Sequence, residues 1–280
     1  MPPREVGACS WSLRAQSPED LARRARAVGV HTLQLALTPY VEEPKKLAKV
    51  VDVLRRSGIA VRSGMLSTIG EDYSSLDSIR RTGGLRPDGH WRANLSRARA
   101  VAGLAKTIGV TLVSFHAGFL PETRVSDERR SMITRLRDVV DAFASEGVRV
   151  ALETGQERAE ILLEVLEDLE RPGCGVNFDP ANMILYGMGD PVAALSILAP
   201  RVFQIHVKDA LRTRTPGTWG EEVPVGKGEV DWPAFFDVVR ARKLEVDLMI
   251  EREAGEDRTA DIQSARALVE RELARIGAAA

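Results

Sequence analysis

Residues 146–154 read Glu-Gly-Val-Arg-Val-Ala-Leu-Glu-Thr, a glycine followed by a short apolar run that ends in a carboxylate. The same opening recurs at Gly29, Gly58 and Gly109, each lying between an amphipathic segment and a Val or Ile. A glycine in this place commonly caps the end of a helix in the left-handed conformation, just before the next strand. The recurring unit therefore predicts an alternation of helices and strands.

Short apolar runs of strand length alternate with longer amphipathic segments along the chain. We expect eight strands, near residues 5–11, 32–38, 59–66, 110–116, 148–154, 174–179, 202–208 and 246–251. The expected helices occupy residues 18–28, 41–57, 94–108, 129–145, 159–169, 191–198, 232–242 and 259–275. Such alternation implies parallel strands with crossover helices, and eight units in about 250 residues are what a closed barrel needs. We predict an α/β protein, a (β/α)8 TIM barrel, with residues 1–280 forming a single domain.

The composition is ordinary for a globular enzyme, with 44% hydrophobic and 28% charged residues and a net charge of −1. This balance gives no global attraction to nucleic acid or to an anionic membrane. No apolar run approaches the roughly 20 residues that span a bilayer, and the first residues contain no apolar signal core. Cys9 and Cys174 are expected to be buried, reduced thiols. A cytoplasmic location is expected.

Two connections are much longer than the others. One covers residues 67–91 after the third expected strand, and the other covers residues 210–230 after the seventh. Because both follow strands, both are expected at the carboxyl-terminal mouth of the barrel. Long loops in that position are usually lids or walls of a substrate pocket.

Polar and apolar side chains alternate within the expected strands. In the seventh strand Ile205 and Val207 share one face, whereas Gln204, His206 and Lys208 share the other. The apolar face suits packing against helices, so the polar face is expected to point into the barrel.

The same alternation in strands four to eight aims one polar side chain from each strand at the mouth: His116, Glu153, Asp179, His206 and Glu251. Three carboxylates in so small a space would repel one another, and a divalent cation is the simplest remedy. Oxygen ligands with one imidazole suit Mn²⁺, Mg²⁺ or Co²⁺ better than a structural Zn²⁺ site, although Zn²⁺ remains an alternative. We predict one divalent ion, with Glu153, Asp179, His206 and Glu251 as its ligands.

Each of these four residues also has a purely structural interpretation. Glu153 could pair with an arginine, and Asp179, which precedes Pro180, could cap a helix. His206 could be a hydrogen-bonded core histidine, and Glu251 could be a charge on the rim. The metal interpretation is favoured because all four residues share the same parity and the same strand end.

Four segments resemble the xylose-isomerase-like barrel superfamily, and within it the sugar phosphate isomerase/epimerase proteins, which include ketose 3-epimerases. These segments cover residues 150–154, 177–182, 204–209 and 249–253, and residues 225–232 resemble a loop of the same group. The resemblance implies that Glu153, Asp179, His206 and Glu251 bind one divalent ion, commonly manganese. It also implies that Glu153 and Glu251 act as acid and base, and that Arg212 contacts the substrate.

Asn182 departs from the pattern, because ketose epimerases and the related AP endonucleases carry a histidine at that position. This departure counts against a nuclease with three zinc ions. We expect Asn182, together with His116, Lys208 and Trp11, to line the substrate site. Lys208 could instead pair with Glu153 or Asp179, since buried charges need partners. His116 could be a hydrogen-bonded interior histidine, and Trp11 could belong to the core.

The predicted function is a metal-dependent isomerase or epimerase of a keto-sugar, which works by proton transfer through an enediolate. One carboxylate removes a carbon-bound proton that the cation has acidified, and another returns it. A dehydratase or lyase of a keto-sugar or inosose would use the same groups. Weaker alternatives are a phosphodiesterase of the AP-endonuclease kind and a non-catalytic sugar-binding barrel. The expected partner is a small sugar or sugar derivative, with no nucleic acid and no membrane. The resemblance is compatible with a homodimer or homotetramer.

Overall fold

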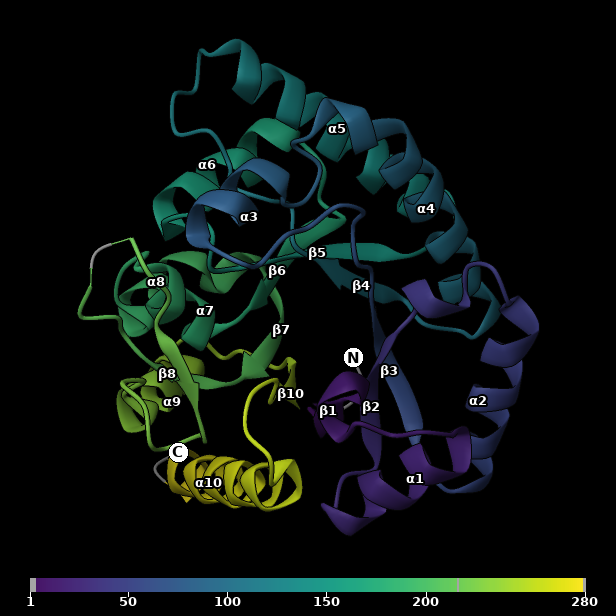
Figure 1. Cartoon of the computed structure of the whole chain (residues 1–280). Coiled ribbons are helices and arrows are strands. Elements are labelled where there is room, and N and C mark those ends of the chain that lie inside the picture. Colours follow the sequence, from purple (N-terminus) through teal and green to yellow (C-terminus); the bar gives the residue numbers. More distant parts are fainter. Residues whose placement is uncertain (1–3, 216, 279–280) are drawn as a thin grey trace.

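A computed structural model of the chain describes residues 4–215 and 217–278. Eight parallel strands close into a barrel in the order β1-β10-β7-β6-β5-β4-β3-β2, and helices surround them (Figure 1). The barrel strands are β1 (Val6–Cys9), β2 (Thr32–Ala36), β3 (Ala60–Met65), β4 (Leu112–Phe115), β5 (Arg149–Glu153), β6 (Cys174–Phe178), β7 (Val202–Val207) and β10 (Asp247–Ile250). The predicted (β/α)8 barrel is confirmed.

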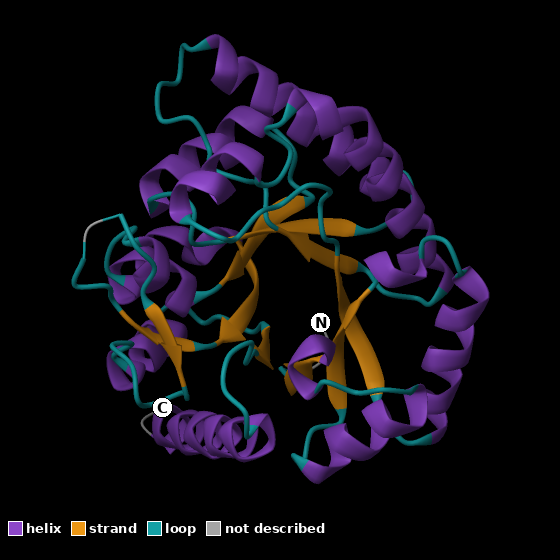
Figure 2. Cartoon of the chain, in the orientation of Figure 1, coloured by secondary structure: helices purple, strands orange, loops and turns teal. Residues whose placement is uncertain are grey.

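A layer of helices packs against the outer, apolar faces of the strands (Figure 2). Its members are α1 (Pro18–Ala27), α2 (Pro44–Arg56), α4 (Asp88–Thr107), α5 (Asp127–Ala144), α6 (Ala159–Leu169), α8 (Pro191–Leu198), α9 (Trp232–Ala241) and α10 (Arg258–Ala278). The core lies between these two layers and contains Phe115, Phe143, Phe178 and Phe235, all fully buried. Among the described helices, none combines the length and the apolar character that a bilayer span requires.

The glycines between helices and strands adopt the expected backbone conformation. Gly109 and Gly147 have φ angles of 75° and 74°, which are left-handed values that favour glycine. Gly109 lies two residues after the end of α4, and Gly147 lies three residues after the end of α5. The sharp turn aims the chain back into the barrel, where β4 and β5 begin.

The long connections contain elements that the periodicity did not predict. Residues 67–91 include helix α3 (Leu76–Thr82), which is capped by Ser75, and α4 begins at Asp88 rather than near residue 94. Residues 210–230 carry an antiparallel hairpin of β8 (Asp209–Leu211) and β9 (Glu221–Val223). A short helix, α7 (Pro180–Tyr186), directly follows β6. These pieces are too short for a repeating pattern, so only local capping marks them.

Three 3-10 turns complete the described elements: η1 (Ser10–Leu13), η2 (Thr38–Tyr40) and η3 (Ala199–Arg201). The first of them shortens the expected first strand, which ends at Cys9. Trp11 therefore lies in a turn above the strand and not in the strand itself.

Strand register sets which side chains become neighbours at the mouth. Glu153 in β5 pairs with Asn177 in β6, and His206 in β7 pairs with Met249 in β10. Because the strands are parallel, two residues that lie the same number of positions beyond such a pair are also neighbours. Lys208 and Glu251, each two residues further along, consequently come side by side.

Candidate metal centre and active site

Four side chains from four neighbouring strands converge inside the mouth of the barrel. Glu153 ends β5, Asp179 directly follows β6, His206 lies in β7, and Glu251 directly follows β10. All four are at most 4% exposed, and one potential ligand atom from each lies within 4.8 Å of the others. His206 Nδ1 is 3.4 Å from Glu153 Oε1, 3.4 Å from Glu251 Oε2 and 3.7 Å from Asp179 Oδ2. The four residues that the sequence singled out therefore form one cluster.

Two atoms of this cluster are buried without a hydrogen-bond partner, namely His206 Nδ1 and Asp179 Oδ2. A buried polar atom left unpaired costs about 1–3 kcal/mol, so such atoms call for an explanation. Asp179 does cap helix α7, but only through Oδ1, which accepts from the backbone N–H of Asn182 at 2.9 Å. Its second oxygen and the imidazole nitrogen remain as ligands, and with the two glutamates they fit a divalent cation.

Burial and the charges around the cluster shift the pKa values of its carboxylates in different directions. Burial raises the pKa of Asp179 to about 6, even though Lys208 opposes the shift. Burial also raises the pKa of Glu251, but Lys208 and His206 together outweigh it and hold that pKa well below its ordinary value. Glu153 behaves similarly, because His116 and His206 lower its pKa against the effect of burial. The two glutamates are therefore ionised at neutral pH.

Glu251 is held from two sides. Trp11 Nε1 donates to its Oε1 at 2.7 Å, and Lys208 Nζ donates to its Oε2 at 2.9 Å. Lys208 also binds Glu253 Oε2 at 2.6 Å, and Asp179 Oδ2 lies 3.9 Å away. Lys208 thus points inward as predicted, but its nearest partners are Glu251 and Glu253, because the β7–β10 register places them beside it.

Glu153 has its own set of neighbours. Asn182 Nδ2 donates to Glu153 Oε1 at 3.1 Å, and His116 Nε2 lies 3.4 Å from the same oxygen. Asn177 Nδ2 contacts Glu153 Oε2 at 3.3 Å. His116 and Asn182 are therefore at the cluster, where the sequence placed them. Asn182 occupies the position expected for a histidine and uses its amide to orient a carboxylate.

A pocket of about 320 Å³ opens directly above these residues. His116, Asn182 and Lys208 form its polar side, and Tyr186 and Trp219 form an aromatic side with ring centres 5.0 Å apart. The remaining lining residues are Tyr73, Leu185, Glu222 and Glu253. Tyr73 and Trp219 come from the two long connections, which confirms that both connections reach the mouth.

Sequence reasoning missed several of these lining residues. Glu253 shares the parity of Glu251 two positions earlier, and that signal could have identified it. Tyr73 and Tyr186 had no such signal, since they lie in a loop and at the end of a short helix. The structure does not bring Arg212 to the cluster. Its side chain is 71% exposed and pairs with Glu229 beyond the hairpin.

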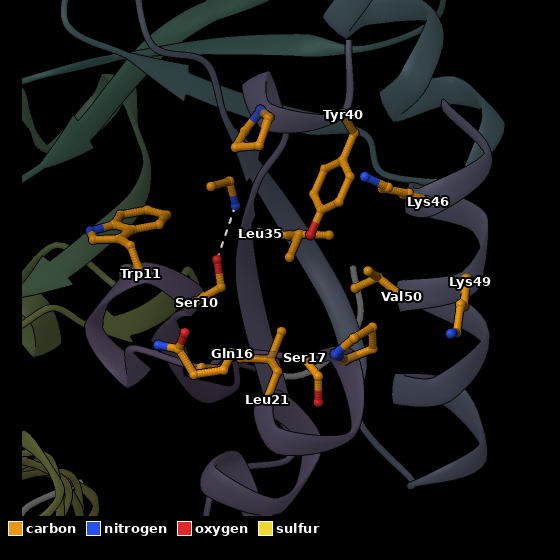
Figure 3. Close-up of a pocket in the computed structure, with 14 residues that line it drawn as sticks. Ser10, Trp11, Gln16, Ser17, Leu21, Leu35, Tyr40, Lys46, Lys49 and Val50 are labelled. Atoms are coloured by element: carbon orange, nitrogen blue, oxygen red, sulfur yellow. Dashed lines mark hydrogen bonds between the residues drawn. The ribbon is translucent and has the colours of Figure 1, made fainter. Parts of the chain in front are cut away.

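Trp11 separates the cluster from a second pocket of about 440 Å³, which lies between η1, α1 and α2 (Figure 3). Leu21, Leu35 and Val50 give this pocket an apolar floor, and Lys46 and Lys49 lie along helix α2 at its side (Figure 3). Trp11 is among the residues that line this pocket, and its indole N–H donates to Glu251. Trp11 therefore supports a carboxylate of the cluster, and its contact with a substrate stays a prediction.

The sequence profile described as "Xylose isomerase-like TIM barrel" matches residues 22–272. The chain belongs to this family. A solved member, a xylose isomerase domain protein from Planctomyces limnophilus, is 33% identical, with a TM-score of 0.86 over 91% of this chain and 93% of that one. The uncharacterized protein YihM of Escherichia coli is 27% identical over 147 residues. That match covers 52% of this chain and only 43% of the length of YihM.

More distant structures share the fold of the family. An L-ribulose 3-epimerase is 17% identical, with a TM-score of 0.71 over 98% of this chain and 95% of that one. The probable 3-DHS dehydratase AsbF from Bacillus anthracis is 18% identical, with a TM-score of 0.71 over 95% of this chain and 98% of that one. The same barrel therefore carries proteins named as epimerases and as dehydratases.

Proposed function

We propose that this protein is a metal-dependent isomerase or epimerase of a keto-sugar. In this proposal one divalent cation, with Mn²⁺ as the first choice, is held by Glu153, Asp179, His206 Nδ1 and Glu251. One observation carries the proposal. Glu153 and Glu251 reach His206 Nδ1 from strands on either side of β7, each at 3.4 Å, beneath an open pocket.

The neighbours of the two glutamates suit them to proton transfer. Both are buried and ionised, and each is oriented by fixed donors: Trp11 and Lys208 for Glu251, Asn182 and Asn177 for Glu153. A carboxylate held in this way can accept a proton from carbon, and its counterpart can return one from another direction. When bound, a divalent cation would polarise the carbonyl and hydroxyl oxygens of the substrate.

The pocket above the cluster fits a sugar. Tyr186 and Trp219 offer aromatic surface to the apolar face of a sugar ring. His116, Asn182 and Lys208 offer polar groups to its hydroxyl and carbonyl oxygens. The distant structures named as epimerases support this choice of chemistry only through their common fold.

The test is solvent deuterium exchange into carbon-bound positions of ketoses, keto-glycosides and inososes, with the protein loaded with Mn²⁺. We expect exchange accompanied by a new epimer or isomer. Glu153→Gln and Glu251→Gln should each slow exchange by at least about 10²-fold, since general acid–base groups contribute that much. The matched control is Glu160→Gln, an exposed residue in the first turn of α6.

The outcomes separate the alternatives. Loss of water or of an aglycone would replace the isomerase assignment with a lyase on the same metal site. Exchange that is unaffected by either glutamine substitution would contradict the roles given to Glu153 and Glu251. Failure to exchange any of these sugars, together with no binding of Mn²⁺, would overturn the proposal.

A further inference from the structure

The second ring nitrogen of His206 faces away from the carboxylates, into a buried polar layer. There, Gln34 Oε1 in strand β2 lies 2.6 Å from His206 Nε2, and both side chains are fully buried. We propose that Gln34 is a positioning residue that keeps a proton on His206 Nε2 and so leaves Nδ1 as the metal-binding nitrogen. The inference deepens, and rests on, the metal site proposed above.

The orientation of the Gln34 amide is set by its other neighbours. Gln34 Nε2 lies 3.3 Å from the backbone oxygen of Gly64 and 2.7 Å from Ser114 Oγ. A backbone carbonyl can only accept a hydrogen bond, so the NH2 group of Gln34 must face it. The amide oxygen is then directed at His206, and because that oxygen carries no proton, His206 Nε2 must be the donor.

Two contacts compete with this arrangement. Cys9 Sγ lies 3.7 Å from His206 Nε2, but its thiol donates to Gln34 Oε1 at 3.5 Å. Asn177 Nδ2 lies 3.0 Å from the same ring nitrogen, and a donor there would favour the opposite tautomer. However, the Asn177 NH2 group also faces the Glu153 carboxylate at 3.3 Å, and Asn177 Oδ1 accepts from Gln204 Nε2 at 3.1 Å. A hydrogen bond to a charged oxygen is stronger than one to a neutral nitrogen. The second hydrogen of this NH2 group could face His206 Nε2, but an unprotonated Nε2 would then meet the lone pairs of Gln34 Oε1 at 2.6 Å, which is the shorter of the two contacts. The proton on Nε2 is therefore favoured.

A proton on Nε2 determines the state of Nδ1, on the opposite side of the His206 ring. His206 Nδ1 has no hydrogen-bond partner and faces Glu153, Asp179 and Glu251. A nitrogen can bind a metal only through its lone pair, so a proton held on Nε2 makes Nδ1 available. Groups that orient a ligand histidine in this way typically change metal affinity by about 10–100-fold when they are removed.

The proton can be located by NMR on protein labelled with ¹⁵N at histidine. The chain has four histidines, so His206 is assigned by elimination with His31→Gln, His90→Gln and His116→Gln. The decisive state is the Mg²⁺-loaded protein, in which we expect Nε2 to keep its proton while Mg²⁺ changes only the Nδ1 signal. This spectrum tests the position of the proton in the unsubstituted protein, without reliance on any variant at Gln34.

Gln34→Met removes the acceptor at nearly constant volume. Its matched control is Gln156→Met, because Gln156 is also a buried glutamine but its amide donates to Tyr186 Oη instead of contacting His206. Calorimetric titration with Mn²⁺ should show an affinity about 10–100-fold lower for Gln34→Met and almost unchanged for Gln156→Met. The Nε2–H signal should weaken only in Gln34→Met.

Two results would overturn the inference: an unprotonated Nε2 in the unsubstituted protein, or equal affinities for Mn²⁺ in the two methionine variants. The proposed function fails separately. If Gln34→Met weakened the binding of Mn²⁺ but the protein exchanged none of the sugars, the positioning role would stand and the isomerase assignment would not.

Discussion

Asp179 shows how one residue can satisfy two interpretations at once. Its Oδ1 caps helix α7, which is the structural role that its position before Pro180 suggested, and its Oδ2 points unpaired into the cluster. The two oxygens can therefore be tested separately, since asparagine is as good an N-cap as aspartate but is a weaker, uncharged metal ligand.

We predict that Asp179→Asn lowers the affinity for Mn²⁺ at least tenfold while leaving the metal-free protein at least as stable. The stability follows because the cap is retained and one of three crowded carboxylates is removed. Calorimetric titration measures the affinity, and denaturant unfolding measures the stability. The control is Asp190→Asn, because Asp190 caps α8 before Pro191 with the same geometry, far from any cluster ligand in sequence. Equal affinities for Mn²⁺ in the two variants would exclude Asp179 as a ligand.

Glu157 carries a second prediction at the scale of one residue. It lies in the loop after β5, and burial raises its pKa from an ordinary value of 4.5 to about 8. The folded state therefore binds more protons than the unfolded state between these values, so stability is highest at low pH and falls as the pH rises through about 8.

Glu157→Gln should remove this dependence. Relative to the variant, the unsubstituted protein should lose stability between pH 5 and pH 9, by an amount on the order of a few kcal/mol. Urea unfolding across this pH range measures the difference, and Glu160→Gln, an exposed change three residues away, serves as the control. If the unfolding free energies of the Glu157→Gln variant and the unsubstituted protein changed in parallel with pH, the prediction would be wrong. The Glu157 carboxyl group would then ionise in the folded protein without loss of stability.

At the scale of elements, two glycines with open space around them should respond in opposite ways to alanine. A Cβ atom at Gly147 or at Gly103 would meet nothing within 4 Å. Steric clashes therefore do not contribute to the effect of alanine on stability at either position. Gly147 has a φ of 74° at the α5–β5 turn, where alanine is strained, whereas Gly103 lies within helix α4.

We expect Gly147→Ala to destabilise the protein by about 1 kcal/mol because of the left-handed backbone. Gly103→Ala should stabilise it by about 0.5–1 kcal/mol through helix propensity. Denaturant unfolding of both variants provides the measurement. If both substitutions changed the unfolding free energy in the same direction, the turn after α5 would not be left-handed in solution.

At the scale of the whole molecule, the candidate ligands join distant parts of the chain. They lie in or directly after β5, β6, β7 and β10, so a bound ion ties together parts of the chain between residues 149 and 251. Any ligand that binds only the folded state stabilises that state by mass action.

We therefore expect Mn²⁺ at about 100 times its dissociation constant to add roughly 2.7 kcal/mol to the unfolding free energy of chelator-treated protein. For a chain of this size the Tm should rise by roughly 5 °C. Scanning calorimetry gives the shift, and Asp179→Asn should reduce it. An unchanged Tm at saturating Mn²⁺ and Mg²⁺ would argue against a resident ion.

The sequence by itself determined the barrel and the residues at its mouth. Eight apolar runs separated by amphipathic segments admit few folds, and in a parallel barrel every strand ends at the same face. The alternation along each strand then dictates which side chains point inward, which is why Glu153, Asp179, His206 and Glu251 could be grouped without coordinates. This information lies in local sequence patterns, because side chains on one face recur every two residues in a strand and every 3.6 residues in a helix.

Tertiary structure alone decided which of the inward groups touch. The partners of Lys208 depend on the register between β7 and β10, and the contact of Gln34 with His206 crosses the barrel between strands 172 residues apart. The exposed position of Arg212 and the arrival of Tyr73 at the pocket depend on loops without periodicity. Contacts of this kind arise from closure of the sheet and packing of its connections, which no stretch of neighbouring residues encodes.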